Sequence, residues 1–487
     1  MGLKRYRNFI DGTWVDAVSG AVFESENPAT REPWAEVADG GPEDIDLAVA
    51  AAARAFAGEW RDYIPQERAR LLRALADLCL ARGPDIARLE VQDNGKLFAE
   101  QQLQWVLISE LLHHWAGVAD KIHGELITSP IPVRGLPLAP SFAYTRREPV
   151  GVVGAITPWN SPANQLSFKF GPAIAAGCTM VLKPSEHTPV SSLEFARLVQ
   201  EAGFPKGVFN VVAGSARSTG EALVSHPEVA KISFTGSTAT GKAIVRAAAE
   251  TMKRVTCELG GKSASLVFAD ADLQKAVKGV AAGIFAATGQ TCMASARVYV
   301  ERPFLAAFVA ALAEFADNMV IGDPLDPKTQ IGPLANRQNF EKVTGYLALA
   351  REEGAHFAAG GTPPEGVSGY YVRPTVLTNV SQDMRVAREE IFGPVVCVMP
   401  FDTEEEAIGL ANDSIYGLAG AVFTENIARA HRVAARVRAG TMWINSYRLV
   451  THMVPFGGYG QSGWGREGGT AGLDAYLETK AVWVPTE

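Results

Sequence analysis

The stretch Gly151-Val152-Val153-Gly154-Ala155-Ile156-Thr157-Pro158-Trp159-Asn160 opens a series of short apolar runs that decides the fold. Four more runs follow at regular intervals, and helical patterns lie between them. The runs are short and mainly apolar, which is typical of strands covered on both faces. We expect a doubly wound parallel sheet of the dinucleotide-binding kind. The four later runs cover residues 180–182, 208–212, 231–234 and 255–257.

A second α/β block extends from Ala264-Ser265-Leu266-Val267-Phe268 to Trp443-Ile444-Asn445. At the N-terminus, Asp11-Gly12 predicts a hairpin turn, because these residues adopt positive φ angles readily. Residues from about 125 to 147 and the tail look like strands without a sheet of their own. The predicted division has a first domain of residues 1–124 and 148–258, a second of 259–450, and a third element of 125–147 and 470–487.

Composition excludes several classes of function. The net charge of −8 and the isoelectric point near 5.6 disfavour nucleic acid as a partner, which clustered Lys and Arg would bind. No apolar stretch is long enough for a membrane span, and the residues from Met1 to Tyr6 lack the apolar run expected of a signal peptide. The five scattered cysteines suit a reducing compartment, so we expect a cytoplasmic protein. No histidine or cysteine cluster predicts a metal site.

Cys292 and Glu258 are the strongest candidates for catalysis. A thiol can attack an electrophilic carbon and hold it covalently. A carboxylate can activate the water that later releases the product. Each residue alone is weak evidence, since a single cysteine is commonly an inert buried residue. Asn160 follows the first strand of the sheet; it is compatible with an ordinary turn residue, and a side-chain amide there could also stabilise an oxyanion.

Two segments are candidates for a nucleotide site. The turn from Phe234 to Gly241 opens a helix, whose free N–H groups suit a pyrophosphate, although it is also compatible with an ordinary strand-to-helix turn. Lys183 and Glu186 follow the second strand at its carboxyl end, where α/β proteins bind their ligands. No Gly-x-Gly-x-x-Gly motif follows any of these strands.

Taken together, these segments resemble the aldehyde dehydrogenase superfamily, and the resemblance runs from Phe9 to about Val484. It implies an aldehyde-dehydrogenase-like fold, in which the second α/β domain is catalytic and the third element serves oligomerisation. Because Glu258 is present, the resemblance is to the hydrolytic, NAD(P)-dependent branch. It also implies that 125–147 and the tail pair across subunits in a homodimer or homotetramer.

The resemblance implies a role for each site residue. Cys292, Glu258 and Asn160 would oxidise an aldehyde to the free acid through a thiohemiacetal and a thioester. Glu186 accepts ribose hydroxyls and would repel a 2′-phosphate, so NAD is preferred and NADP is possible. The residues expected at the cofactor are Ile156, Thr157, Pro158, Trp159, Lys183, Ser185, Glu186, Gly236, Ser237, Gly241, Leu259, Glu390 and Phe392.

The expected substrate entrance is largely apolar, which suits an aliphatic or aromatic aldehyde. Arg448 leaves an alternative open. It could bind the carboxylate of a semialdehyde, or serve packing and ion pairs. The residues expected there are Leu107, Ser161, Asn164, Phe168, Thr291, Met293, Arg448, Val450 and Phe456.

Two other functions compete with this interpretation. A cysteine hydrolase would also use Cys292, but it needs a histidine partner, and the eight histidines form no such signature. A non-catalytic binding or structural protein on this fold would be expected to lose the thiol, the base or the oxyanion donor. All three are present in the sequence, which favours the enzyme.

Overall fold

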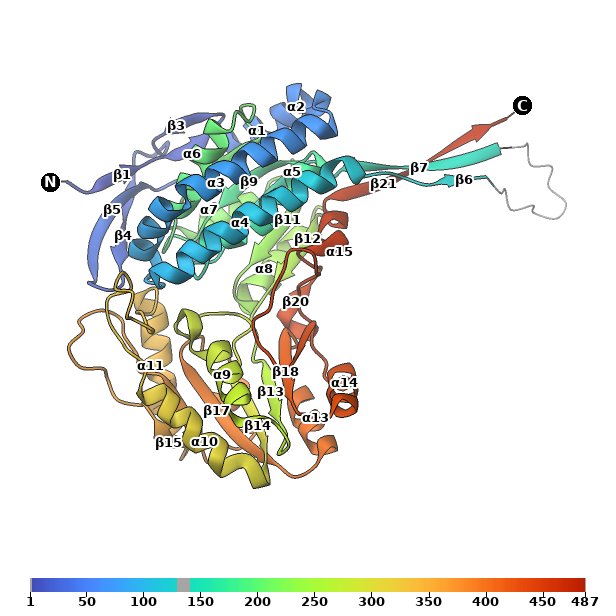
Figure 1. Cartoon of the computed structure of the whole chain (residues 1–487). Coiled ribbons are helices and arrows are strands. Elements are labelled where there is room, and N and C mark those ends of the chain that lie inside the picture. Colours follow the sequence, from blue (N-terminus) through green and yellow to red (C-terminus); the bar gives the residue numbers. More distant parts are fainter. Residues whose placement is uncertain (1, 129–140, 487) are drawn as a thin grey trace.

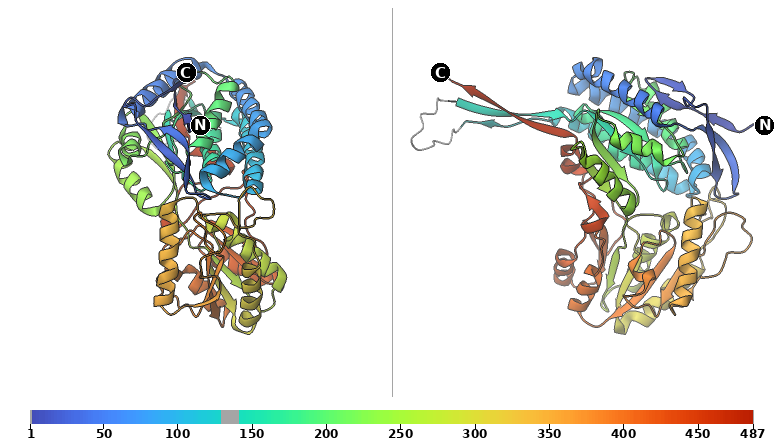
Figure 2. Two further views of the ribbon diagram at one scale, coloured as in Figure 1. Left: turned by 90° about the vertical axis from the view of Figure 1, so that its left-hand side faces the viewer. Right: turned by 180° about the vertical axis from the view of Figure 1, so that it is seen from behind.

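The protein has two main bodies, each built on a sheet of mostly parallel strands. One body lies above the other in Figure 1. The computed structural model describes residues 2–128 and 141–486. A third, narrow sheet projects from the body as an arm, as Figure 1 and the right-hand view of Figure 2 show. The predicted α/β fold class is confirmed.

The first sheet has eight strands, and its five central strands are the five apolar runs of the sequence. These five are parallel to one another. Nearly all their residues are buried, which explains why the strands are mainly apolar. In order across the sheet, the strands are β20 (Gly463–Trp464), β12 (Arg254–Glu258), β11 (Val229–Thr235), β8 (Val152–Ile156), β9 (Thr179–Lys183), β10 (Phe209–Val211), β2 (Asn8–Ile10) and β3 (Thr13–Val15).

The strand order reverses between β8 and β11. From β8 the chain proceeds to β9 and β10 on one side, and it then crosses to β11 and β12 on the other. Ligands of open α/β sheets bind outside the carboxyl ends of the strands at such a reversal. The loops that begin at Thr157 and Gly236 therefore border the expected binding crevice.

Helices cover both faces of this sheet. One face packs against α1 (Pro42–Ala57), α7 (Arg217–Ser225) and α8 (Thr238–Ala249). The other face packs against α5 (Pro162–Ala176) and α6 (Val190–Glu201). These two lie beneath the long pair α3 (Pro65–Asn94) and α4 (Phe98–Val118), with a short helix α2 (Glu59–Asp62) and the turn η1 (Ala119–Lys121) beside them.

The second sheet has seven strands, of which all but β15 run parallel. Its order is β15 (His356–Ala359), β16 (Thr375–Thr378), β17 (Val395–Phe401), β14 (Arg297–Glu301), β13 (Ala264–Val267), β18 (Ala419–Phe423) and β19 (Thr441–Ile444). Helices again cover both faces: α9 (Leu273–Ile284) and α10 (Arg302–Asp317) on one, and α11 (Arg337–Glu352), α12 (Arg385–Arg388), α13 (Glu404–Asn412) and α14 (Ile427–Arg436) on the other.

The prediction that the two outlying segments lack a sheet of their own is wrong. The two segments expected to lack a sheet pair with each other within the chain, in the order β21 (Leu477–Pro485), β7 (Ser141–Pro149) and β6 (Leu126–Ile127). Neighbouring strands of the arm run antiparallel to each other, and their pairing provides hydrogen-bond partners for the backbone groups along the shared edges. Residues 129–140 of the predicted segment 125–147 lie outside the described residues.

Several elements connect the predicted parts of the chain. The N-terminal hairpin forms as expected, with positive φ at Asp11 and Gly12, and β2 pairs with β10 at the sheet edge. The short strand β20 pairs with β12, so a segment beyond residue 450 joins the first sheet. The turn η3 (Gly460–Ser462) precedes it, and α15 (Gly469–Asp474) leads to the arm. A small separate sheet contains β1 (Lys4–Tyr6), β5 (Glu32–Ala38) and β4 (Val22–Asn27).

No helix in the described parts of the chain combines the length and the apolar character needed to cross a bilayer.

Candidate active site

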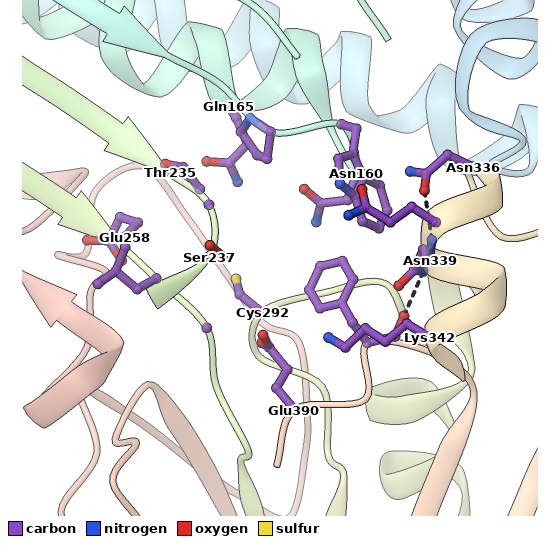
Figure 3. A pocket seen from close by; sticks show the side chains of 17 residues that line it. Asn160, Gln165, Thr235, Ser237, Glu258, Cys292, Asn336, Asn339, Lys342 and Glu390 are labelled. Carbon is purple, nitrogen blue, oxygen red and sulfur yellow. Dashed lines mark hydrogen bonds between the residues drawn. The ribbon is translucent and has the colours of Figure 1, made fainter. Parts of the chain in front are cut away.

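The candidate site is a cavity of about 400 Å³ that lies between the strand ends of the two sheets (Figure 3). The carboxyl ends of β8, β11 and β12 border it on one side. Segments that enter β14 and β17 at their amino ends border it on the other. Cys292, Glu258 and Asn160, which lie far apart in the sequence, all line this cavity. Its other lining residues are Pro158, Trp159, Gln165, Thr235, Gly236, Ser237, Leu259, Gly260, Asn336, Gln338, Asn339, Lys342, Glu390 and Phe392.

Cys292 follows a strained turn, the short helix η2 (Ala286–Gly289). Ala287 and Thr288 have φ angles of 51° and 54°, and Gly289 has 71°. Left-handed conformations of non-glycine residues cost ~1–3 kcal/mol each and persist where the surroundings hold them. At Gly289 a side chain would not fit, because a Cβ would lie 2.1 Å from a backbone carbonyl oxygen.

Hydrogen bonds from the parts of the protein around each of the two sheets hold this turn. Glu100 of α4 accepts a hydrogen bond from the Ala287 N–H at 2.9 Å. Thr288 Oγ1 donates to the Gly332 carbonyl at 3.1 Å. Gln290 accepts from the Ala335 N–H at 2.9 Å. The turn that positions the thiol is therefore held by the surrounding protein rather than by its own sequence.

The Cys292 thiol lies deep in the protein and keeps part of its surface open to the cavity. Burial raises its pKa to about 12, and the charges of Glu258 and Glu390 act in the same direction. The N–H groups of Met293 and of Cys292 itself lower it in part. Without a ligand, this thiol is protonated at neutral pH, so it needs a base or a nearby cation to react.

Glu258, the last residue of β12, is buried and only 4 % exposed. Neither of its carboxylate oxygens has a hydrogen-bond partner among the described residues. Gly457 lies so close that a Cβ there would be 2.7 Å from Oε1. Burial and the charge of Glu467 raise the pKa of Glu258 well above its usual range, while Lys169 and Arg466 lower it. A carboxylate with a raised pKa is a stronger base once it is ionised.

The sequence analysis missed Lys169 and Glu467. Lys169 is fully buried, and its ammonium pairs with Glu467 at 2.5 Å and donates to Thr235 Oγ1 at 2.7 Å. Buried charges are almost always paired in this way. A lysine between two phenylalanines of an apolar helical run was the available signal, whereas nothing local indicated Glu467 as its partner.

Asn160 reaches the cavity from the loop after β8. Its Nδ2 donates to the Gln290 carbonyl at 2.8 Å, close to the cysteine turn. Asn339 of α11 donates to Gln290 Oε1 at 3.1 Å and to the Phe392 carbonyl at 3.0 Å. Phe392 has a φ angle of 64°, so this bond holds a strained residue at the cavity. Asn336, the N-cap of α11, accepts from the Asn339 N–H. Polar residues of this helix start were not among the predicted site residues.

The predicted cofactor residues fall into two groups. Seven line the cavity: Pro158, Trp159, Gly236, Ser237, Leu259, Glu390 and Phe392. The rings of Trp159 and Phe392 meet edge to face at 5.2 Å between centroids. Glu390 accepts the Gly261 N–H at 2.8 Å, and its pKa is raised by burial. The other six lie at or near the ends of β8 and β9 and on α8: Ile156, Thr157, Lys183, Ser185, Glu186 and Gly241.

The ends of β9 and β11 carry the polar groups that the sequence analysis predicted for a dinucleotide. Ser237 is the N-cap of α8 and its Oγ accepts the Thr240 N–H at 3.2 Å, so the helix presents its N-terminus beside the cavity. Lys183 and Glu186 form an ion pair at 3.3 Å. Burial raises the pKa of Glu186, but the charge and hydrogen bond of Lys183, the Glu186 backbone N–H and the His187 charge together outweigh it, and the pKa lies below its usual value. Glu186 is thus an anionic acceptor at neutral pH.

The nine predicted substrate residues lie outside the lining of this cavity. Ser161 and Thr291 are buried, and they neighbour Asn160 and Cys292 in the chain. Leu107 and Val450 are exposed, on α4 and in the loop after β19. The other five are half-buried: Asn164, Phe168, Met293, Arg448 and Phe456. Among the described residues, no three His, Cys, Asp or Glu side chains gather as possible metal ligands.

Comparison with known proteins agrees with this geometry. A model of the aldehyde dehydrogenase family matches residues 14–482. An aldehyde dehydrogenase of Enchytraeus buchholzi is 47% identical over 98% of this chain and 95% of its own length. A betaine aldehyde dehydrogenase of Rhizobium etli is 45% identical over 98% of this chain and 96% of its own.

Solved structures show the same relationship. The NAD⁺ complex of an aldehyde dehydrogenase from Bacillus cereus superposes with a TM-score of 0.96 and 46% identity, covering 99% of this chain and 97% of the other. The chain belongs to the aldehyde dehydrogenase family and is an oxidoreductase that acts on aldehydes.

Proposed function

We propose that the protein oxidises an aldehyde to the free carboxylic acid with NAD, through a covalent intermediate on Cys292. The observation that carries this proposal is the cavity itself, which brings Cys292, Glu258 and Asn160 together beside the predicted nicotinamide residues. The related structure from Bacillus cereus is a complex with NAD⁺, which supports the choice of cofactor.

The residues present fit NAD. The N-terminus of α8 suits the pyrophosphate, and the anionic Glu186 suits ribose hydroxyls while it repels a 2′-phosphate. Glu390 and the edge-to-face pair of Trp159 and Phe392 would contact the nicotinamide half of the cofactor. NAD supplies the hydride acceptor when bound. We therefore propose NAD as the preferred cofactor and NADP as a poorer one.

This chain's residues can perform each remaining step. The Cys292 thiolate attacks the aldehyde carbon, and a thiohemiacetal forms. Its oxyanion lies within reach of the Asn160 amide and the Cys292 N–H, and one such donor contributes ~2.7–4 kcal/mol to catalysis. Loss of hydride from this carbon converts it to a thioester. Glu258 then takes a proton from water, hydroxide adds to the thioester, and the acid leaves as the thiol reforms.

Three further proposals follow from the sequence. The body divides into a nucleotide-binding and a catalytic domain around the two sheets. The arm, with its exposed Trp483, associates with another subunit in a homodimer or homotetramer. The substrate has an apolar aliphatic or aromatic body, which the side chains of Phe168, Met293 and Phe456 would contact.

Two variants test the chemistry. Cys292→Ala should abolish dehydrogenase activity and still bind NAD, because only the covalent step is lost. Glu258→Gln should release one equivalent of NADH in a pre-steady-state burst and then turn over very slowly, because the thioester waits for its base. Near-wild-type turnover of Cys292→Ala would refute the covalent mechanism. A burst followed by normal turnover would assign the base to another residue.

A further inference from the structure

Gln165 is a polar residue of the cavity that the proposed mechanism does not use. It lies on α5, one helical turn before Lys169, so the two side chains leave the same face of the helix. Lys169 donates to Thr235 Oγ1 at 2.7 Å, and Thr235 pairs in register with Glu258 on the neighbouring strand. The face of α5 that carries Gln165 therefore covers the strand ends where the proposed base lies.

The side chain of Gln165 extends from this face into the cavity. Helical side chains lean toward the helix N-terminus, and α5 begins shortly after Asn160. In the view of Figure 3, Gln165 lies between Thr235 and Asn160, and Cys292 lines the same cavity. Its amide is therefore available to a small molecule that is bound near the base and the thiol.

Three buried acceptor atoms at this cavity lack a hydrogen-bond donor. They are Oε1 of Gln165 and both carboxylate oxygens of Glu258, and none of them has a partner among the described residues. An amide oxygen and an ionised carboxylate cannot satisfy each other, because both only accept hydrogen bonds. Leaving a buried acceptor without a donor is costly. These two side chains therefore suit a small ligand that has two donor hydrogens, and water is such a ligand.

We propose that Gln165 positions the water molecule that hydrolyses the thioester. This inference rests on the proposed function. One O–H of the water donates to Gln165 Oε1, and the other donates to Glu258, which takes that proton. The remaining hydroxide oxygen bonds to the thioester carbon, the bond from this carbon to the Cys292 sulfur breaks, and the proton held by Glu258 passes to the sulfur. Gln165 exchanges no proton, so it is a positioning residue that orients the attacking oxygen.

A single turnover measures this step directly. Gln165→Met removes the amide and keeps much of the length of the side chain. The full-length protein is mixed with NAD and benzaldehyde, with hexanal as a second substrate, and samples are quenched in acid. Mass spectrometry then follows the acyl group on Cys292. We expect the acyl-enzyme to form at the wild-type rate with one equivalent of NADH. Its decay should be slower by about tenfold or more, because the reacting water loses a fixed hydrogen bond.

Steady-state kinetics separate this role from general damage to the cavity. If only hydrolysis slows, kcat and KM for the aldehyde fall together and kcat/KM stays near the wild-type value. A lower kcat/KM and a slower NADH burst would instead indicate a distorted cavity and would overturn the proposal. Gln165→Asn keeps a shorter amide and should recover part of the decay rate. Gln66→Met, at an exposed position of α3, is the matched control and should behave as the wild type.

A double variant tests whether Gln165 and Glu258 act on one water molecule. In the Glu258→Gln background, Gln165→Met should slow the decay by much less than tenfold, because the base no longer activates the water that Gln165 holds. A full tenfold effect in that background would overturn the shared role.

Titration with NAD tests the other ligand that could satisfy the Gln165 amide, because the carboxamide of the cofactor also has two donor hydrogens. We expect Gln165→Met to bind NAD as the wild type does. Weaker NAD binding with unchanged decay of the acyl-enzyme would overturn the proposal. A Glu258→Gln protein that forms no acyl-enzyme would refute the proposed function, whereas normal decay in Gln165→Met would refute the role of Gln165 alone.

Discussion

Replacing Glu258 by glutamine should stabilise the protein increasingly as the pH rises. The carboxyl group is buried, neither oxygen has a hydrogen-bond partner among the described residues, and burial raises its pKa well above the usual range. An ionised carboxylate in this position opposes folding, because water solvates it only in the unfolded chain. Glutamine has nearly the same shape and carries no charge.

The size of the effect follows from proton linkage. The folded-state pKa of Glu258 is raised, so its contribution to stability is fully present below the unfolded value and is lost as the pH rises through the folded value. Between these two pKa values the folded protein holds one proton more at this site. The free energy of unfolding of the wild type should therefore fall, relative to Glu258→Gln, by ~1.4 kcal/mol for each pH unit.

Equilibrium urea unfolding of both proteins at a series of pH values and one fixed concentration measures this difference. The exposed Glu24 offers a matched control, since Glu24→Gln should follow the wild-type curve at every pH. Parallel curves for the wild type and Glu258→Gln above pH ~4.3, where an exposed glutamate ionises, would refute the reasoning. A confirmed difference would show that the base is maintained at a cost in stability.

Four other predictions concern the site and the arm. Glu258→Gln should also speed alkylation of Cys292 by iodoacetamide in the absence of cofactor at a pH above the raised pKa of Glu258, because the ionised carboxylate there raises the thiol pKa; a slower reaction would contradict this. Gly289→Ala should lose most activity, since the left-handed turn alone costs ~1–2 kcal/mol with a side chain and the Cβ has no room; near-normal kcat would show that the turn is tolerant. Glu186→Gln should narrow the preference in kcat/KM for NAD over NADP, and a wild type that prefers NADP would refute the carboxylate argument. Deletion of residues 477–485 should lower the mass measured by light scattering, and an unaltered mass would remove the arm from assembly.

The local pattern of the sequence was sufficient for the fold class. Short apolar strands, helices between them and the Asp11-Gly12 turn all depend on neighbouring residues, and all appear in the structure. The rule that ligands bind at the carboxyl ends of parallel strands placed Asn160 and Glu258 at one edge.

The sequence by itself thus determined the two α/β units, the family and the candidate thiol, base and oxyanion donor, because periodicity, turn chemistry and motifs act over a few residues. Only the tertiary structure decided the partners of these groups. Lys169 and Glu467 are 298 residues apart, and Lys96 and Ser161 are 65 apart. The strained turn before Cys292 persists because Glu100 and Gly332 hold it from outside. Such pairings depend on which surfaces pack together when the whole chain folds, and no short stretch of sequence carries that information.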